Sequence, residues 1–277
     1  MSIFKKNKSS NGDDTNNNNT NTNHNINQDS TKNTKPVNRV SIFDTEYPID
    51  KSDWFQVFSA CLGKVVTIQN ACAGQVVKGQ NWNVDFSTGM IQFGNDSYPV
   101  QFIGSESTIS DTWLWGWENV NGFDESLLKF ANELKEVGEK WNLEPFMVSQ
   151  FSLGETLNGH YLSIAACGIL KENYCYYRGP HENGAVFMAF SGVPDSVFAP
   201  VGIQEFAHTV LDCIQQMPVE HKIFVESYLI WNGNSYEWDG NTLTAHFEET
   251  DLVIGFENVD GLWRIKKLNT KIGSGVK

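Results

Sequence analysis

Positive charge is scarce in this chain of 277 residues, which has 20 Lys and Arg against 33 Asp and Glu. The formal net charge is −13 and the isoelectric point is about 4.8. Binding to a nucleic-acid backbone requires clustered positive charge that neutralises phosphates. The composition therefore predicts that nucleic acid is not a partner of this protein.

Long apolar stretches are also missing. No run approaches the ~18 apolar residues that a membrane-spanning helix requires. The start of the chain offers only Ile3 and Phe4, whereas a secretory signal needs ~7–15 apolar residues. Five widely spaced cysteines are an odd number and do not suggest a disulfide framework. We therefore predict a cytoplasmic protein with reduced thiols and no stable membrane association.

The common motifs for phosphate binding, serine hydrolysis and zinc coordination are absent. There is no G-x-S-x-G, no P-loop, no G-x-G-x-x-G before a helix, and no H-x-x-x-H or C-x-x-C. Glu205, His208 and Asp212 would share one polar face of a helix, which fits a metal site but is more typical of a solvated face. We predict no metal and no cofactor. Catalytic residues stay unassigned, and the sequence favours a protein that is not an enzyme.

Apolar and aromatic residues are plentiful, at 40% and 13% of the chain, but they are unevenly distributed. Residues 1–40 hold twelve Asn, one aromatic residue, and six basic against three acidic side chains. Such a segment cannot bury enough apolar area to offset the entropy of ordering it. We therefore predict a disordered Asn-rich tail at 1–40. The remaining 237 residues hold 14 basic and 30 acidic side chains, a net charge of −16.

Apolar periodicity in the rest of the chain predicts the α+β class, with antiparallel meanders and hairpins packed with about four helices. Helical spacing covers 53–77, a segment after Asp124, 158–170 and 203–217. Alternation of period two covers 82–102, 112–117, 174–179 and 185–190. After the helix that ends at Pro218 we expect only a four- or five-stranded meander. The predicted division is an α+β domain at 41–200 and a helix with a meander at 201–277, and whether they share one core stays open.

The segment 112–119 contains Trp113, Trp115 and Trp117, which share one face if the segment is a strand. Three such indoles form either a wall of the core or an exposed platform that stacks on a sugar, a base or a partner protein. Packing explains most large apolar residues, so the core interpretation is favoured. The three tryptophans are kept as candidate binding residues.

The same segment carries a resemblance to a known family. The motifs are W-N-V-D-F at 82–86, T-W-L-W-G-W-E-N at 112–119 and Y-Y-R-G-P at 176–180. They resemble a bacterial family of unknown function that has a T-W-x-W-x-W-x-N signature and a later Y-Y-R-G-P segment. The resemblance covers roughly residues 50–192. It implies a cytosolic bacterial protein of similar fold, and it assigns no activity and no catalytic residue.

Arg178 and Tyr177, in the last of these motifs, are further candidate binding residues. Arg178 beside a Gly-Pro turn could hold a carboxylate or phosphate by a bidentate contact. Pairing with one of the many acidic side chains of this chain is the more common role of such an arginine. Cys175 and His181 suggest a Cys-His nucleophile. Strand alternation places Cys175 on the face opposite to Arg178, which favours a buried structural thiol.

Two functional hypotheses stay open. The first is a non-catalytic binding protein with a basic protein partner, for example a toxin that it neutralises, in which charge complementarity raises the association rate. The second is a small-molecule-binding protein or enzyme with a cone-like pocket in the C-terminal meander, an analogy at the level of the fold alone. The expected lining of that pocket is Trp231, Tyr236, Trp238, His246 and Trp263. We rank the first hypothesis above the second.

Overall fold

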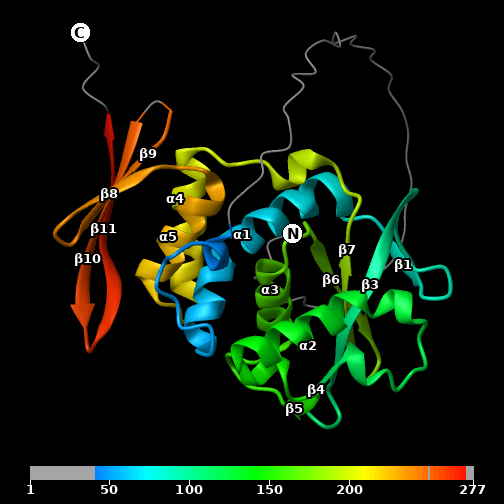
Figure 1. Cartoon of the computed structure of the whole chain (residues 1–277). Helices are drawn as coiled ribbons and strands as arrows, with labels where there is room; N and C mark the ends of the chain where they lie inside the picture. Colours follow the sequence, from blue (N-terminus) through cyan, green and yellow to red (C-terminus); the bar gives the residue numbers. More distant parts are fainter. Residues whose placement is uncertain (1–40, 249, 273–277) are drawn as a thin grey trace, which may run out of the picture.

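A computed structural model describes residues 41–248 and 250–272 (Figure 1). The α-helices are α1 (Trp54–Cys72), α2 (Lys129–Trp141), α3 (Gly159–Ile169), α4 (Ile203–Gln216) and α5 (His221–Asn232). The first seven strands are β1 (Trp82–Asp85), β2 (Met90–Phe93), β3 (Asp96–Ser107), β4 (Thr112–Trp115), β5 (Gln150–Ser152), β6 (Cys175–His181) and β7 (Gly184–Phe190). The last four strands are β8 (Tyr236–Asp239), β9 (Thr242–His246), β10 (Thr250–Val259) and β11 (Leu262–Ile272).

These elements confirm the α+β class, with five α-helices and two antiparallel sheets in the described ranges rather than about four helices. The tail predicted at 1–40 lies outside the described residues. Within the described ranges, no helix has the length and apolar content needed to cross a membrane.

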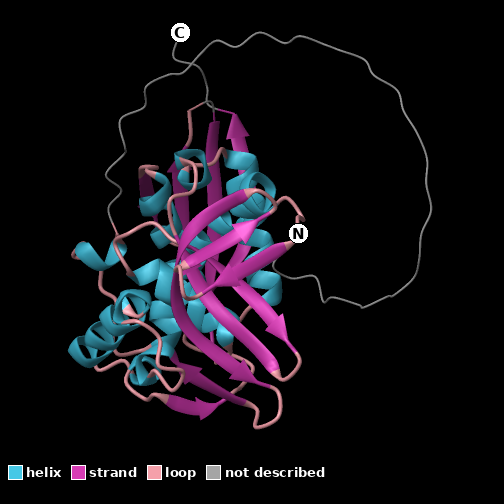
Figure 2. Ribbon diagram, turned by 90° about the vertical axis from the view of Figure 1, so that its right-hand side faces the viewer, coloured by secondary structure: helices cyan, strands magenta, loops and turns pink. Residues whose placement is uncertain are grey.

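The larger sheet has seven strands, and the long strand β3 lies at its centre. β3 pairs with β2 through its first four residues, 96–99, and with β7 through residues 100–107. β4 pairs with residues 104–107 on the other side of β3, and β5 follows β4. β1 extends the sheet beyond β2, and β6 extends it beyond β7. In Figure 2 this sheet faces the viewer and the helices lie behind it.

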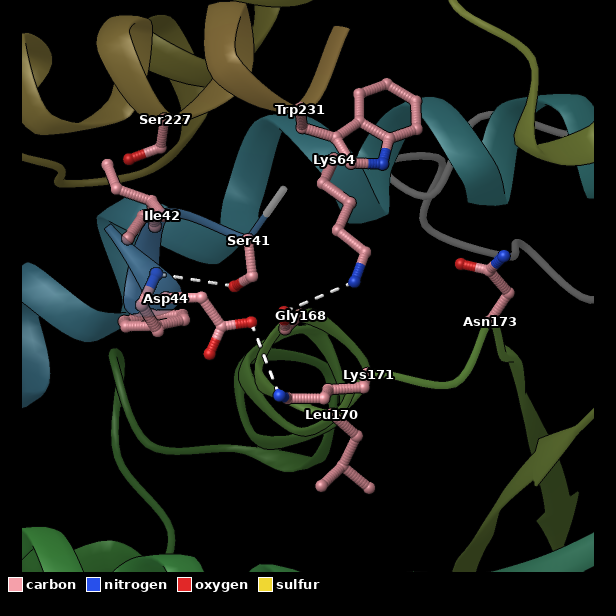
Figure 3. Close-up of a pocket in the computed structure, with 12 residues that line it drawn as sticks. Ser41, Ile42, Asp44, Lys64, Gly168, Leu170, Lys171, Asn173, Ser227 and Trp231 are labelled. Carbon is pink, nitrogen blue, oxygen red and sulfur yellow. Dashed lines mark hydrogen bonds and ion pairs between the residues drawn. The ribbon is translucent and has the colours of Figure 1, made fainter. Parts of the chain in front are cut away.

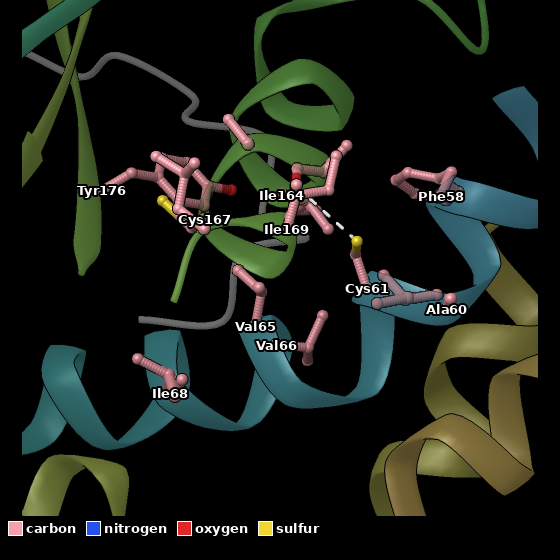
Figure 4. Packing of buried hydrophobic residues seen from close by; sticks show 14 of the residues in the cluster. Phe58, Ala60, Cys61, Val65, Val66, Ile68, Ile164, Cys167, Ile169 and Tyr176 are labelled. Carbon is pink, nitrogen blue, oxygen red and sulfur yellow. Dashed lines mark hydrogen bonds between the residues drawn. The ribbon is translucent and has the colours of Figure 1, made fainter. Parts of the chain in front are cut away.

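Helix α1 lies between the two halves of the molecule. Its N-cap is Asp53, whose side chain accepts a hydrogen bond from the Gln56 amide at 3.1 Å. Twelve of its 19 residues are buried, which is expected of a helix that packs on more than one side. On one side it packs against α3, where the Cys61 thiol points to the Ala165 carbonyl oxygen at 3.6 Å (Figure 4). On the other side it packs against α5.

The contact between α1 and α5 is close because Gly63 has no side chain. A Cβ atom added to Gly63 would lie 2.6 Å from the Cβ of Tyr228, a distance at which one of the helices must move. The hydroxyls of Thr67 and Tyr228 form a buried hydrogen bond of 2.5 Å. The Glu220 amide donates to Ser59 Oγ at 2.9 Å. Packing and buried polar contacts therefore both join α1 to the C-terminal region.

The prediction that only strands follow Pro218 is wrong, because residues 221–232 form α5. Glu220 caps this helix by accepting a hydrogen bond from the Ile223 amide at 2.6 Å, and Gly233 ends it with a φ of 82°. Ten of its 12 residues are buried. A helix buried on nearly all sides lacks the amphipathic pattern by which α4 could be predicted. The four strands after it form the predicted meander, in the order β8, β9, β10, β11.

The prediction of a strand that continues to Trp117 is also wrong. β4 ends at Trp115, and residues 116–118 form a 3₁₀ turn that ends at Asn119 with a φ of 46°. Asn119 Oδ1 accepts from the Phe123 amide at 2.7 Å, which holds this turn. Asp124 caps a second 3₁₀ turn at 125–127 rather than α2 itself.

Buried apolar side chains from both halves of the chain form one continuous cluster. It includes Phe58 and Val65 of α1, Phe187 of β7, Phe224 of α5 and Ile254 of β10. The C-terminal helices and sheet therefore pack on the rest of the protein rather than standing apart from it.

Candidate functional site

The three candidate tryptophans belong to the core or its margin. Trp113 and Trp115 are 0% and 1% exposed, and Trp117 is half-buried. The Trp117 ring stacks on Trp115 with centroids 4.6 Å apart, and Trp115 Nε1 donates to the Pro145 carbonyl at 2.8 Å. These contacts leave Trp113 and Trp115 no open face on which a ligand could stack.

Arg178 forms an ion pair inside the protein. Its Nε lies 3.6 Å from Glu106 Oε2, and the two side chains are 35% and 12% exposed. The other Glu106 oxygen accepts from the Gly159 amide at 2.7 Å, at the N-terminus of α3. The guanidinium carbon lies 5.9 Å from the centre of the Phe187 ring. Glu106 thus takes the position that the carboxylate of a ligand would need, and the pair connects β6, β3 and α3.

His160 lies beside this ion pair and was not predicted from the sequence. Its Nδ1 is 3.1 Å from the Tyr176 hydroxyl, within hydrogen-bonding distance. Burial and the nearby charge of Arg178 lower its pKa to about 4. The ring is therefore neutral at pH 7. Only its position two residues after Asn158, the N-cap of α3, marks it in the sequence.

Tyr177 lies on the opposite face of β6 and does not join Arg178. Its ring packs between Trp82 and Phe93, at centroid distances of 5.2 and 5.1 Å. Cys175 and His181 are the first and last residues of β6. Strand geometry of about 3.3 Å per residue separates their backbones by roughly 20 Å, so they do not form a nucleophilic pair.

The thiols do not have the character of nucleophiles. All five cysteines lie in the described residues, and all five are free and buried. Burial raises the pKa of Cys61 and of Cys167 to about 12. A hydrogen bond with Cys72, together with burial, raises the pKa of Cys175. Because the thiolate is the reactive form, the thiols of Cys61, Cys167 and Cys175 are poor nucleophiles.

On α4, His208 Nε2 lies 3.2 Å from Asp212 Oδ2, and both side chains are exposed. In residues 41–248 and 250–272, no group of three or more His, Cys, Asp or Glu side chains is arranged to hold a metal ion.

The five residues expected to line one C-terminal pocket lie on different surfaces. Trp238 faces α5, where its Nε1 donates to Glu226 Oε1 at 2.8 Å. His246 lies on the other face of the sheet, where its Nδ1 is 2.9 Å from Asp251 Oδ1. Trp231 lines a cavity on the far side of α5. Strand alternation and the intervening helix thus separate His246 and Trp231 from the other three side chains, and the five do not line a single pocket. Tyr236, Trp238 and Trp263 lie together against Glu226 and Lys222 of α5.

A buried polar cluster lies between α5 and the small sheet. Glu226 is 4% exposed and accepts hydrogen bonds from Trp238 Nε1 and from the Tyr47 hydroxyl. Burial and the Glu226 carboxylate raise the pKa of Tyr236 to about 12. Lys222 Nζ lies 4.4 Å from the centre of the Trp238 ring. This cluster joins α5, β8 and the segment before α1.

The outer face of the small sheet is strongly acidic. Residues 234–260 hold seven Asp and Glu and no Lys or Arg. Strand alternation turns the buried residues of β8–β10 toward α5 and places their charged residues outside. We name as the acidic sheet face Glu237 and Asp239 of β8, Glu248 of the β9–β10 turn, and Asp251 and Glu257 of β10. Figure 1 shows no described helix or strand outside these strands.

Other side chains contact only part of the acidic sheet face. Asp251 Oδ1 lies 2.9 Å from His246 Nδ1, and Glu257 pairs with Lys266 of β11 at 2.8 Å. Glu237 and Asp239 are exposed and form no ion pair with any described residue. The run of acidic residues is visible in the sequence. Its concentration on one face follows only once Tyr236 and Trp238 are known to point inward.

A cavity of about 360 Å³ lies between the segment 41–44, α1, the end of α3 and α5 (Figure 3). Its apolar lining is Ile42, Phe43, Ala60, Leu170 and Trp231. Its polar lining is Ser41, Asp44, Lys64, Lys171, Asn173 and Ser227, with Gly168 between them. No local sequence pattern predicts this cavity, because its lining comes from four separate segments.

Comparison with known protein families finds a match for part of the chain. Residues 56–193 match the model of a family of unknown function, DUF6882. This segment is a DUF6882 domain. The DUF6882 domain includes most of α1 and ends just after β7, so α4, α5 and the small sheet lie outside it. The acidic sheet face is therefore outside the DUF6882 domain, whereas the cavity is formed partly by it. No curated protein and no solved structure matches the chain.

Proposed function

We propose that this protein is a non-catalytic cytosolic binding protein and that its acidic sheet face docks a basic protein partner. The observation that carries the proposal is the row formed by Glu237 and Asp239 on β8. Both are exposed, both point away from α5, and neither has an ion-pair partner in the described residues.

The charge balance of the whole molecule supports this surface as a docking site. Residues 41–277 hold 30 acidic and 14 basic side chains. In the described part, Lys or Arg pairs with a carboxylate at three places. A surface with so much uncompensated negative charge repels itself and attracts basic proteins, whose association it accelerates. The same charge repels nucleic-acid phosphates.

The proposal that the protein is not an enzyme rests on the protonation state and contacts of its titratable side chains. Burial keeps the thiols of Cys61 and Cys167 protonated at neutral pH, since their pKa is about 12. Arg178 is engaged by Glu106, and His160 is packed at an edge-to-face angle against Phe187, 5.6 Å away. Free cysteines support a reducing compartment such as the cytosol.

The test is affinity capture from a native lysate with three baits. The first is the wild-type chain. The second is Glu237→Gln/Asp239→Asn/Glu248→Gln, which neutralises three charges of the acidic sheet face. The third is Glu133→Gln/Glu136→Gln/Glu139→Gln, which neutralises three exposed carboxylates of α2 and gives the same net charge.

We expect the wild type and the α2 variant to retain one basic protein in stoichiometric amount, and the sheet variant to lose it. Association should slow as the salt concentration rises, because exposed charges are screened. Equal capture by the sheet variant, loss with both variants, or the absence of a stoichiometric basic partner would overturn the proposal.

A further inference from the structure

β8 is an edge strand of the small sheet, and in the described residues it pairs with β9 alone. The His246 amide of β9 donates a hydrogen bond to the Ser235 carbonyl oxygen at 2.9 Å. Backbone groups alternate in direction along an antiparallel strand, so Glu237 also bonds to β9. Tyr236 and Trp238 occupy the alternate positions. Their amide and carbonyl groups therefore point away from β9, toward the open edge of the sheet.

These edge groups have no partner in residues 41–248 and 250–272. No hydrogen bond outside the ladder with β9 involves the backbone amide or carbonyl group of Tyr236 or of Trp238. At the other edge of the sheet, by contrast, the Ile265 amide of β11 donates to His221 Nδ1 of α5 at 2.9 Å. Unpaired amide and carbonyl groups along an edge are a template for the addition of a further strand. β8 is therefore positioned to accept one.

The side chains of β8 have different chemistry on the two faces of the sheet. Glu237 and Asp239 are exposed on the acidic sheet face and form no ion pair with a described residue. Tyr236 and Trp238 are half-buried and lie on the face that packs on α5. Directly opposite residues of an antiparallel pair lie on the same face, with their Cβ atoms about 4.5–5.5 Å apart. An added strand would thus place alternate side chains opposite two carboxylates and the others opposite two aromatic rings.

The charges of β8 determine which kind of strand fits. Two copies of β8 paired with each other would place carboxylates opposite carboxylates, and like charges in that position destabilise a pair of strands. A strand with Lys or Arg at every second position places opposite charges together instead. Apolar residues at the intervening positions would lie on the same face as Tyr236 and Trp238.

We propose that the open edge of β8 binds an extended basic segment of the protein partner, which becomes a fifth, antiparallel strand of the small sheet. This inference rests on the proposed function and specifies how the partner docks. Hydrogen bonds to the backbone of Tyr236 and Trp238 fix the position of the segment. Basic side chains opposite Glu237 and Asp239 select its sequence, as alternate side chains do in other cases of strand addition.

The test measures the fluorescence anisotropy of three labelled peptides titrated with the full chain. The first is Lys-Val-Lys-Val-Lys-Val-Lys. The second carries N-methyl groups on the valine amides and the third on the lysine amides, so all three have the same side chains and charge. With lysines on the acidic sheet face of an antiparallel strand, the valine amides point toward β8 and the lysine amides point away from it.

We expect saturable binding of the unmodified peptide with one site per chain. N-methylation of the lysine amides should leave its Kd unchanged, whereas N-methylation of the valine amides should weaken binding by at least about tenfold, because it removes donors and blocks the close approach of the two strands. No protein variant is needed for this comparison.

Two variants of the chain locate the peptide. Glu237→Gln/Asp239→Asn should weaken the unmodified peptide by at least about threefold, since two favourable cross-strand charge pairs are lost. The control Glu136→Gln/Glu139→Gln removes two exposed carboxylates of α2 and gives the same net charge. It should leave the Kd unchanged. Circular dichroism establishes that each variant is folded.

Four results would overturn the inference. The first is the absence of saturable binding of the unmodified peptide, and the second is equal weakening by Glu237→Gln/Asp239→Asn and its control. The third is a dimer of the chain alone that Glu237→Gln/Asp239→Asn strengthens, because the occupant of the edge would then be a second copy. The fourth is an equal Kd for the two methylated peptides. If that equality is accompanied by weaker binding to Glu237→Gln/Asp239→Asn than to its control, strand addition is wrong and docking at the acidic sheet face stands.

Discussion

Acid should destabilise this protein through two histidines that are held neutral. Burial, with a contribution from Arg178, lowers the pKa of His160 from its usual 6.5 to about 4. Burial, with a contribution from Arg264, lowers the pKa of His221 to about 4 as well. His221 Nδ1 accepts a hydrogen bond from the Ile265 amide at 2.9 Å, an interaction that a protonated ring cannot make.

The direction of this pH effect on stability follows from proton linkage. Between pH 6.5 and about 4 the unfolded chain binds a proton at each histidine and the folded chain does not. The free energy of unfolding therefore falls as the pH falls through this window, and it is unaffected by these groups above it. At about 1.4 kcal/mol per pH unit the full window corresponds to about 3 kcal/mol for a fully buried group. Because His160 is only half-buried, about 1–3 kcal/mol is the expected loss at that residue.

The assay is urea unfolding followed by tryptophan fluorescence, at about pH 7 and about pH 4.5, for the wild type and His160→Asn/His221→Asn. Asparagine can place a carboxamide oxygen near the former Nδ1 atom but does not titrate. Protonation of carboxylates affects both proteins alike, so the difference between their pH dependences isolates the histidines. The variant should lose less stability than the wild type on acidification. An equal loss in both proteins would refute the assignment of imidazoles that are neutral in the folded protein.

Three further substitutions test the packing. Gly63→Ala should lower the free energy of unfolding by about 1–3 kcal/mol, because the new methyl group overlaps with Tyr228; unchanged denaturant midpoints would contradict the close α1–α5 contact. Glu226→Ala should lower the free energy of unfolding by about 1–3 kcal/mol for each buried donor left unpaired. Calorimetry should show a reduced Tm, and an unchanged Tm would mean that water replaces the carboxylate without cost. Trp115→Ala should lower it by about 3–5 kcal/mol as a cavity-forming change in the core; a loss of less than about 1 kcal/mol in urea unfolding would argue against its complete burial.

Much of the fold could be predicted from periodicity. Helix α4 has its apolar stripe on one side and is bounded by Pro218. Asp-Gly turns separate β8 from β9 and β10 from β11, so these elements also follow from local patterns. Helix α5 could not be predicted in this way. It is buried on nearly all sides, so the pattern that marks an amphipathic helix is missing.

The sites were less accessible to sequence reasoning. The burial of Trp113 and Trp115 agrees with the packing interpretation of the tryptophan motif. The partner of Arg178 is Glu106, which lies 72 positions earlier in the chain, and no local pattern indicates that pairing. No local pattern indicates the cavity between the end of α3 and α5 either. Contacts between distant segments require the tertiary structure.

The most direct test of the proposed function is the salt dependence of the association rate between the captured basic partner and this protein. Surface plasmon resonance at about 50 mM and about 500 mM salt should show a steep fall of the rate for the wild type and for Glu133→Gln/Glu136→Gln/Glu139→Gln. Glu237→Gln/Asp239→Asn/Glu248→Gln should associate slowly at both concentrations. A wild-type rate that does not depend on salt, or the same salt dependence in both variants, would contradict docking at the acidic sheet face.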